Sequence, residues 1–292
     1  MKVGIIGAGK VGTAFGKFLI NHGISVIGYN SRSKKSLEHA INYTKTRAFQ
    51  KEELINAADV IFITVKDDQI QNVLETSIDT FQDLREKTFI HMSGVHSSKI
   101  LIKAYEKKAD IYALHPLQSV SNIEKAVKDF EKTYFSIESI GSKNKHIKKI
   151  LSSINHYFEI EPNQKSVYHM SACVFSNYLT TLIDFGLELT SSIGIDKDKA
   201  FEAMLPLINS TIKNIQNEGI EHSLTGPLAR GDVKTIESHL ESYNKVNQEY
   251  ESFYRVMGIK TLDYIEKNSI QKTEIIKNMR NVLEDSHEKD NN

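Results

Sequence analysis

The glycine run near the start of the chain constrains the fold more than any other feature. It is the stretch GAGKVG, residues 7–12, between the apolar run Lys2–Ile6 and the helical pattern TAFGKFLINHG. A second apolar run, Ser25–Tyr29, follows. In such a strand–turn–helix–strand unit the first glycine permits a tight turn, the second lets the backbone approach a pyrophosphate, and the third lets helix and strand pack closely. The phosphates would then lie at the positive end of the helix.

The spacing therefore predicts a dinucleotide-binding turn rather than a purely structural glycine turn. The residues expected to contact the cofactor there are Gly7, Gly9, Lys10, Val11 and Gly12.

The end of the second predicted strand indicates which dinucleotide binds. Enzymes that use NAD usually place a carboxylate there to hold the ribose 2′-hydroxyl. This chain has Asn30, Ser31 and Arg32 instead, followed by further hydroxyl and cationic side chains. An arginine fork is suited to a 2′-phosphate. A solvated basic loop is the alternative, and we expect NADP(H).

Further apolar runs predict a mostly parallel sheet of the Rossmann type. They are Asp59–Val65, Thr88–Met92 and Ile111–Leu114, with weaker strands at Tyr134–Glu138 and Tyr157–Glu161. Ligands of open α/β sheets bind beyond the carboxyl ends of the strands. We therefore expect the residues that follow the apolar runs to face the cofactor: Val65, Lys66 and Asp67, then Ser93 and His115.

Beyond Pro162 the strand pattern stops and helical spacing begins. Apolar residues recur at intervals of three and four from Lys165 to about Ile193, which predicts one long helix, buried in its own domain or against a second subunit. A second helix is expected to start at Asp196 and stop at Gly219. The expected class is α/β plus all-α: residues 1–162 form a Rossmann domain, 163–285 a helical domain, and 286–292 a disordered tail.

Composition excludes several kinds of partner. Lys plus Arg and Asp plus Glu both number 37, so no overall basic field attracts nucleic acid or an anionic membrane. No apolar run approaches the roughly 18–20 residues of a membrane span. The single cysteine, Cys173, fits a reducing cytosol, and we expect a cytoplasmic protein without a metal site.

A nicotinamide reductase needs few catalytic groups, because the cofactor supplies the hydride. His115 is the first candidate for a polar group beside the substrate, although a lone histidine is more often structural. Ser93 is the second, although strand-end serines are commonly helix caps. On the long helix, Ser176 and Asn177 interrupt the apolar surface and require partners, which are backbone groups, water or substrate.

Five motifs in order resemble a known family: GIIGAGKVG, HMSG, HPLQS, SACVFSNYLTTL and LTGPLARGD. Together they resemble the bacterial Rossmann-like proteins that carry the C-terminal domain DUF2520, in the 6-phosphogluconate dehydrogenase-like superfamily. Within that group the sequence is similar to the alternative ketopantoate reductases of pantothenate biosynthesis. The resemblance implies a helical second domain, an active site between the domains and commonly a homodimer formed through the helical domain.

The resemblance also implies roles for individual residues. Hydroxyacid dehydrogenases and ordinary ketopantoate reductases of the superfamily have a catalytic lysine one turn before an asparagine. Here Asn177 is preceded at that distance by Cys173, so the proton donor is open between His115 and water. The motif TGPLARGDV places Thr225 and Arg230 as candidates for substrate binding, Arg230 because a guanidinium suits a carboxylate. Its Arg-Gly-Asp tripeptide is not expected to mediate adhesion.

The sequence thus predicts an NADPH-dependent reductase of a small 2-oxo acid, foremost 2-dehydropantoate (ketopantoate) to (R)-pantoate. Three alternatives stay open. They are an imine reductase resembling pyrroline-5-carboxylate reductase, an NADP:F420 oxidoreductase, and a non-catalytic NADP(H)-binding sensor.

Overall fold

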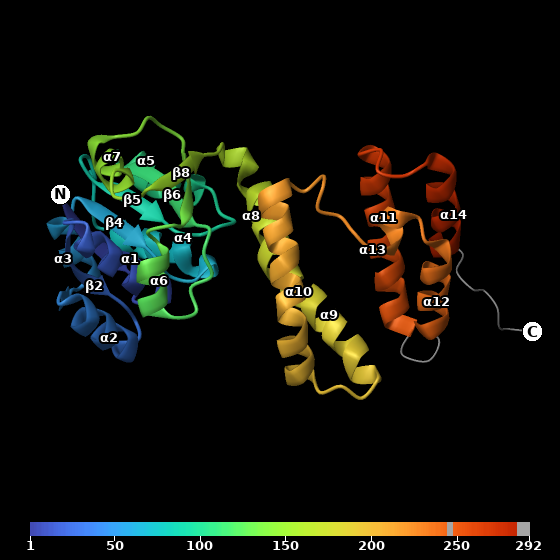
Figure 1. Ribbon diagram of the computed structural model, residues 1–292. Coiled ribbons are helices and arrows are strands. Elements are labelled where there is room, and N and C mark those ends of the chain that lie inside the picture. The colour runs from blue at the N-terminus through green and yellow to red at the C-terminus, as the bar shows by residue number, and fades with distance from the viewer. Residues whose placement is uncertain (244–247, 285–292) are drawn as a thin grey trace, which may run out of the picture. The chain divides into compact units, whose positions relative to one another are not determined.

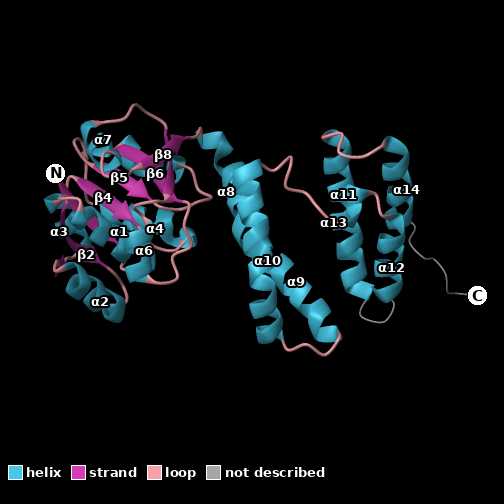
Figure 2. Ribbon diagram, in the orientation of Figure 1, coloured by secondary structure: helices cyan, strands magenta, loops and turns pink. Residues whose placement is uncertain are grey.

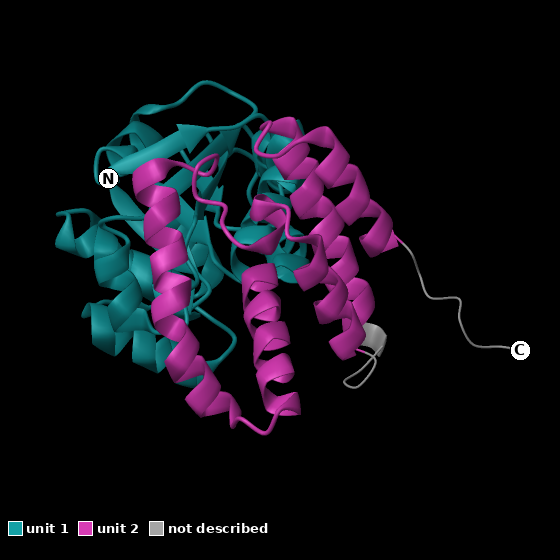
Figure 3. Cartoon of the chain, turned by 45° about the vertical axis from the view of Figure 1, so that its right-hand side comes forward, with its two compact units in different colours: residues 1–176 teal, residues 177–292 magenta. Residues whose placement is uncertain are grey.

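The structure is a computed structural model that describes residues 1–243 and 248–284. Contacts divide the chain into two compact units, residues 1–176 and 177–292 (Figure 3). The first unit thus extends past the predicted boundary at residue 162, because the helix α8 (Lys165–Cys173) buries its first residue in that unit. The predicted disordered tail, 286–292, lies outside the described residues.

The first unit is built on one eight-stranded sheet with the order β3-β2-β1-β4-β5-β6-β7-β8 (Figures 1 and 2). All neighbouring strands are parallel except β6 and β7. The predicted fold class is confirmed. The strands are β1 Lys2–Ile6, β2 Ser25–Asn30, β3 Arg47–Ala48, β4 Val60–Ile63, β5 Thr88–His91, β6 Asp110–Pro116, β7 Tyr134–Ser139 and β8 His156–Glu159.

Helices cover both faces of this sheet, so the central strands are apolar on both sides. One core cluster joins a face of the sheet to α1 (Lys10–Asn21), α2 (Lys34–Thr44), α6 (Ile123–Asp129) and α7 (Lys145–Leu151). The other joins the opposite face to α3 (Lys51–Ala57), α4 (Ile70–Ile78) and α5 (Ile102–Glu106). Because β1, β4, β5 and β6 are parallel, their carboxyl ends meet at one edge of the sheet.

The predicted long helix consists of α8, a π-helical segment at Val174–Tyr178, and α9 (Leu179–Ser192). In the single chain its apolar residues are not buried in their own domain, and burial against a second subunit stays a prediction. Val167 is 63% exposed and Phe175 is 78% exposed. The face of α8 that packs against the rest of the first unit carries Lys165, Tyr168 and His169 instead.

The second unit contains helices only among its described residues. Its core lies among α11 (Pro227–Arg230), α12 (Val233–Tyr243), α13 (Gln248–Lys267) and α14 (Thr273–Glu284). Helix α10 (Lys197–Glu218) packs along α9, starts after the capping side chain of Asp196 and stops at Gly219, as predicted. Across the described parts of both units, none of the helices combines the length and the apolarity that crossing a membrane requires.

Candidate active site

The glycine turn after β1 shows three different requirements at its three glycines. Gly7 has φ +113°, and a Cβ there would lie 2.7 Å from the backbone of Thr64. A Cβ on Gly12 would lie 2.2 Å from Thr64 Oγ1, because α1 packs closely on β4. Around Gly9, by contrast, no atom lies within 4 Å of an added Cβ. Two glycines are therefore fixed by packing and the third is not.

The open position at Gly9 fits a cofactor. Gly9 is the N-cap of α1 and has no side-chain capping bond, so the first amide groups of this helix are available to an anion. Lys10 is exposed beside it and Val11 is half-buried. The backbone thus has the shape and the electrostatics that a pyrophosphate requires.

The residues at the end of β2 divide into structural and accessible ones. Asn30 is half-buried and its side-chain amide donates to the carbonyl of Phe49 at 2.8 Å, so it connects the end of β2 to the residue that follows β3. Ser31 is half-buried and Arg32 is exposed, immediately before α2. After β4, Val65 is half-buried while Lys66 and Asp67 are exposed.

A polar cluster occupies the same edge of the sheet at β5, β6 and β7. His91 ends β5, and His115 lies within β6, which continues to Pro116 rather than ending at Leu114 as predicted. His115 pairs across the ladder with Ser136 of β7. Helix α8 completes the polar cluster, which we define by six side chains: His91, His115, Glu138, Lys165, Tyr168 and His169.

His115 and Tyr168 form the closest pair in the polar cluster. His115 Nδ1 lies 2.7 Å from the hydroxyl of Tyr168. Burial, and next the charge of Lys165, lower the pKa of His115 to about 3. Burial raises the pKa of Tyr168. Both groups are therefore neutral near pH 7, and the pair acts through its hydrogen bonds.

The imidazole ring of His91, also in the polar cluster, holds the loop after β5. His91 is fully buried, its Nδ1 accepts from the amide of Ser93 at 3.1 Å, and its Nε2 lies 3.2 Å from the carbonyl of Ser97. Ser93 is buried, and its hydroxyl accepts from the amide of His96 at 3.3 Å. Both residues use their polar atoms within the loop, which indicates a structural contribution from each.

Gly94 in this loop lies against His115 and His169 of the polar cluster. A Cβ on Gly94 would be 2.9 Å from His115 Nε2 and 2.5 Å from His169 Cδ2. The ring edge of His115 that is not bonded to Tyr168 thus lies directly beside the Gly94 backbone. The glycine of the HMSG motif sets the position of the His115 ring.

Lys165 was not among the residues predicted from the sequence. Its side chain is 1% exposed, and Nζ lies 5.3 Å from the centroid of the Tyr168 ring. Burial lowers the pKa of Lys165 to about 8, while Glu138 and Asp67 act in the opposite direction. Glu138 itself accepts two 2.6 Å bonds from Ser98, so it is committed to the loop.

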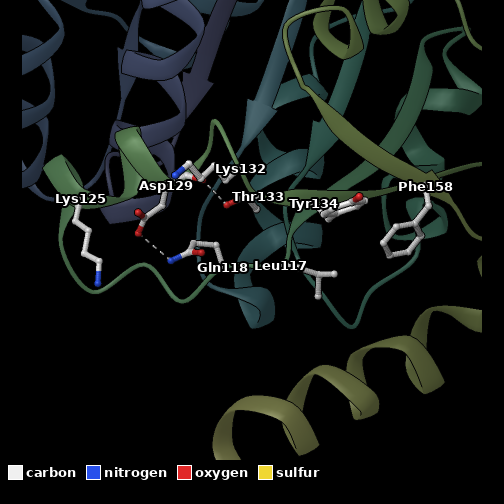
Figure 4. A pocket seen from close by; sticks show the side chains of 8 residues that line it. All are labelled: Leu117, Gln118, Lys125, Asp129, Lys132, Thr133, Tyr134 and Phe158. Carbon is white, nitrogen blue, oxygen red and sulfur yellow. Dashed lines mark hydrogen bonds between the residues drawn. The ribbon is translucent and has the colours of Figure 1, made fainter. Parts of the chain in front are cut away.

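The first unit has an open hollow of about 550 Å³, and Figure 4 shows the side chains that line it. Gln118 of the HPLQS motif lines it and bonds to Asp129 at 3.2 Å. Phe158 lines it as well, and its ring packs on Tyr168 with centroids 5.9 Å apart. The hollow therefore adjoins the His115–Tyr168 pair through Phe158.

The remaining predicted residues belong to the π-helical segment or to the second unit. Ser176 and Asn177 are exposed. Thr225, just before the short helix α11, and Arg230, its last residue, are also exposed. In the same motif Gly226 has φ +94°, Pro227 begins α11, and Asp232 bonds Thr235 at the start of α12. These three residues form a helix connection, as the sequence indicates.

Two family models match the chain. Residues 2–93 match the family described as NADP oxidoreductase, coenzyme F420-dependent. Residues 133–261 match the domain of unknown function DUF2520. The resemblance to Rossmann-like proteins with a DUF2520 domain is thus confirmed, and the predicted NADP(H) cofactor agrees with the description of the first family. No curated protein matches the sequence.

Solved structures share the fold over nearly the whole chain. Protein TM1727 from Thermotoga maritima is 25% identical, covers 97% of this chain and 98% of its own, and has a TM-score of 0.66. Protein BF3122 from Bacteroides fragilis is 21% identical over 88% of this chain and 96% of its own, with a TM-score of 0.67. Pyrroline carboxylate reductase from Plasmodium falciparum, solved with NADP bound, is 17% identical, covers 97% of this chain and 96% of its own, and has a TM-score of 0.56.

Proposed function

Because the chain fits the Rossmann-like oxidoreductase family, we propose that it is an NADPH-dependent reductase of a small 2-oxo acid, foremost 2-dehydropantoate to (R)-pantoate. One observation carries the proposal. The open glycine turn follows β1, His115 lies near the carboxyl end of the parallel strand β6 with Tyr168 bonded to it, and both lie at the same edge of the sheet. That edge is where open α/β sheets bind their ligands.

The proposed chemistry gives each group a simple task. The reduced nicotinamide supplies a hydride to the oxo carbon. A neutral imidazole carries one ring proton, and the proposal takes the tautomer in which Nδ1 accepts from the Tyr168 hydroxyl and the proton lies on Nε2. His115 Nε2 then donates to the substrate oxygen as charge develops there. Because the pKa of His115 is lowered, this donor keeps the same form across the neutral pH range.

Three residues of the second unit belong to the proposal as contacts to the substrate. Arg230 is exposed and carries a planar, permanently charged fork that matches a carboxylate. Asn177 and Thr225 offer further hydrogen-bonding groups. In this proposal Arg230→Ala raises KM for the 2-oxo acid more than KM for NADPH. Equal effects on the two KM values would show that Arg230 does not bind the substrate.

The substrate is tested by a panel assay on the purified protein. Oxidation of NADPH with ketopantoate, much faster than oxidation of NADH, supports the proposal. Turnover of pyrroline-5-carboxylate or F420 in place of ketopantoate supports the reductase function but assigns a different substrate. The description of the family at residues 2–93 is the reason to include F420. Calorimetric NADPH binding without turnover of any of the three supports the sensor alternative.

A homodimer and a cytoplasmic location complete the proposal. Apolar side chains are exposed along the long helix and on α10, among them Met170, Val174, Tyr178, Leu182 and Leu207. Exposed apolar surface of this extent is typical of an interface. A second copy of the chain would cover it, and light scattering of the wild type and of Val174→Glu tests this. A monomeric wild type would contradict the dimer.

A further inference from the structure

The buried amine of Lys165 has no role in the function proposed so far. Its Nζ has no hydrogen-bond partner among the described residues, although its side chain is 1% exposed. Burying a charge without a partner destabilises a fold, so a retained amine of this kind needs a reason. Among the described residues no group of three metal-ligating side chains is present that would make it part of a metal centre.

The position of Lys165 relates it to the His115–Tyr168 pair. Lys165 and Tyr168 are one helical turn apart on α8, and Nζ lies 5.3 Å from the centroid of the Tyr168 ring. Tyr168 in turn lies 2.7 Å from His115 Nδ1. The ammonium group of Lys165 therefore lies next to the ring of Tyr168, and the hydroxyl of Tyr168 lies next to the imidazole of His115.

We propose that Lys165 is a positioning residue whose ammonium group stabilises negative charge on Tyr168 while His115 protonates the substrate. This inference rests on the proposed reductase function and extends it to the source of the proton. It places the cation near the start of the long helix, in the first unit, and at a different position from the lysine of related enzymes that precedes the asparagine.

The proton transfers balance as follows. His115 Nε2 gives its proton to the substrate oxygen, whose carbon receives the hydride. His115 Nδ1 takes the hydroxyl proton of Tyr168, so the imidazole stays neutral and Tyr168 becomes a phenolate. Lys165 stabilises that phenolate across the contact with the ring. After product release, water returns one proton to Tyr168 and the imidazole exchanges its ring proton back to Nε2.

Charged groups around Lys165 come from every strand of the polar cluster and from the segment after β4. Glu138 and Asp67 favour the ammonium form, and the ammonium disfavours protonation of both histidines. The groups that face Lys165 are Asp67, His91, His115, Glu138 and Tyr168. Loss of the Lys165 proton above about pH 8 would leave the phenolate without its counter-charge.

The first experiment compares two substitutions with the wild type over a range of pH. Lys165→Met removes the charge at similar length and lowers kcat at pH 7 by roughly 10- to 100-fold, within the range of acid catalysis, while the Kd for NADPH stays unchanged. Lys165→Arg keeps a permanent charge, and its kcat persists above pH 8, where that of the wild type falls. A pH profile of Lys165→Met that matches the wild type overturns the proposal.

The second experiment does not depend on turnover. Titration of the His115 ring by NMR, assigned with His115→Gln, measures whether the charge of Lys165 reaches the pair. The pKa of His115 rises in Lys165→Met and stays low in Lys165→Arg. An equal pKa in all three proteins overturns the proposal. If no substrate is reduced, the reductase function fails, and this titration still decides where the Lys165 charge acts.

Discussion

The glycine turn after β1 and the polar cluster beside it occupy one edge of one sheet, yet they are built in different ways. The turn consists of backbone, and its geometry depends on the absence of side chains at Gly7 and Gly12. The polar cluster consists of side chains from three strands and one helix, including a fully buried His91 and a lysine that is 1% exposed. In the proposed function, the turn binds the cofactor through the shape of its backbone, and the polar cluster transfers a proton to the substrate.

This difference affects how each region tolerates change. An added Cβ would lie 2.7 Å from the Thr64 backbone at Gly7 and 2.5 Å from the Gly7 carbonyl oxygen at Gly12. In the polar cluster, side chains of similar size can replace one another, and the change appears in pKa values before it appears in the fold. Substitutions in the turn should therefore alter structure, and substitutions in the polar cluster should alter chemistry.

The largest effect is expected in the turn, where two glycines can be compared directly. Gly12→Ala places a Cβ 2.2 Å from Thr64 Oγ1, and we expect a loss of several kcal/mol in stability with no measurable NADPH binding. Gly9→Ala meets no atom within 4 Å and should keep normal stability while weakening NADPH binding. Thermal unfolding and calorimetry measure the two properties. Equal melting temperatures for both variants would contradict a turn fixed by packing.

The next effect concerns stability in the polar cluster. The pKa of Lys165 lies below its ordinary value of 10.5, at about 8, so the unfolded chain holds this proton more tightly than the folded chain. The cost is present in full below pH 8 and disappears as pH rises through 10.5. Lys165→Met should therefore be more stable than the wild type at pH 7 by about 3 kcal/mol, with the difference vanishing near pH 10.5. Denaturant unfolding at several pH values checks this, and a less stable variant at pH 7 would refute it.

A smaller effect is expected from Gly94, the glycine that lies against the polar cluster. Gly94→Ala would push a Cβ against His115 Nε2 and His169. Because a misplacement of about 1 Å can cost about 100-fold in rate, we expect kcat to fall by roughly 10- to 100-fold. The Kd for NADPH should stay within about twofold, measured by fluorescence. Loss of NADPH binding instead would show that the two regions are not separable.

The smallest effect concerns the specificity of the turn region for its cofactor. Arg32→Ala removes an exposed guanidinium at the end of β2. We expect KM for NADPH to rise by about tenfold, in line with a charge-assisted hydrogen bond, and KM for NADH to stay unchanged. Lys34→Ala, in the first turn of the next helix, serves as the matched control. A parallel change in both cofactors would exclude a contact between Arg32 and the 2′-phosphate.

The two regions also differ in how far the sequence predicted them. The turn was predictable because glycine spacing records a backbone requirement directly. Strand β3 is two residues long and α14 was not predicted, since short or marginal elements depend on tertiary packing. Lys165 was taken only as the start of a helix, because burial of one amine depends on which face of α8 meets the sheet.

A signal for the polar cluster was nevertheless present in the sequence. Lys165, Tyr168, His169 and Cys173 recur at the spacing of one helical face, within a segment whose other positions are mainly apolar. We expected the apolar positions to be buried in their own domain or against a second subunit, and within the chain the polar positions face inward. For a helix with two patterned faces, the sequence alone does not determine which face meets its own chain and which meets another molecule.

The π-helical segment at Val174–Tyr178 affects how this helix is compared across relatives. A π-helical turn takes up an additional residue, and such segments are associated with functional sites. A position described as one turn before Asn177 therefore corresponds to Ala172 as well as to Cys173. If a relative lacks the additional residue, counting positions along the sequence would misalign by one every residue on one side of the π-helical segment. Equivalent residues in related chains should therefore be matched by superposition of α8 alone.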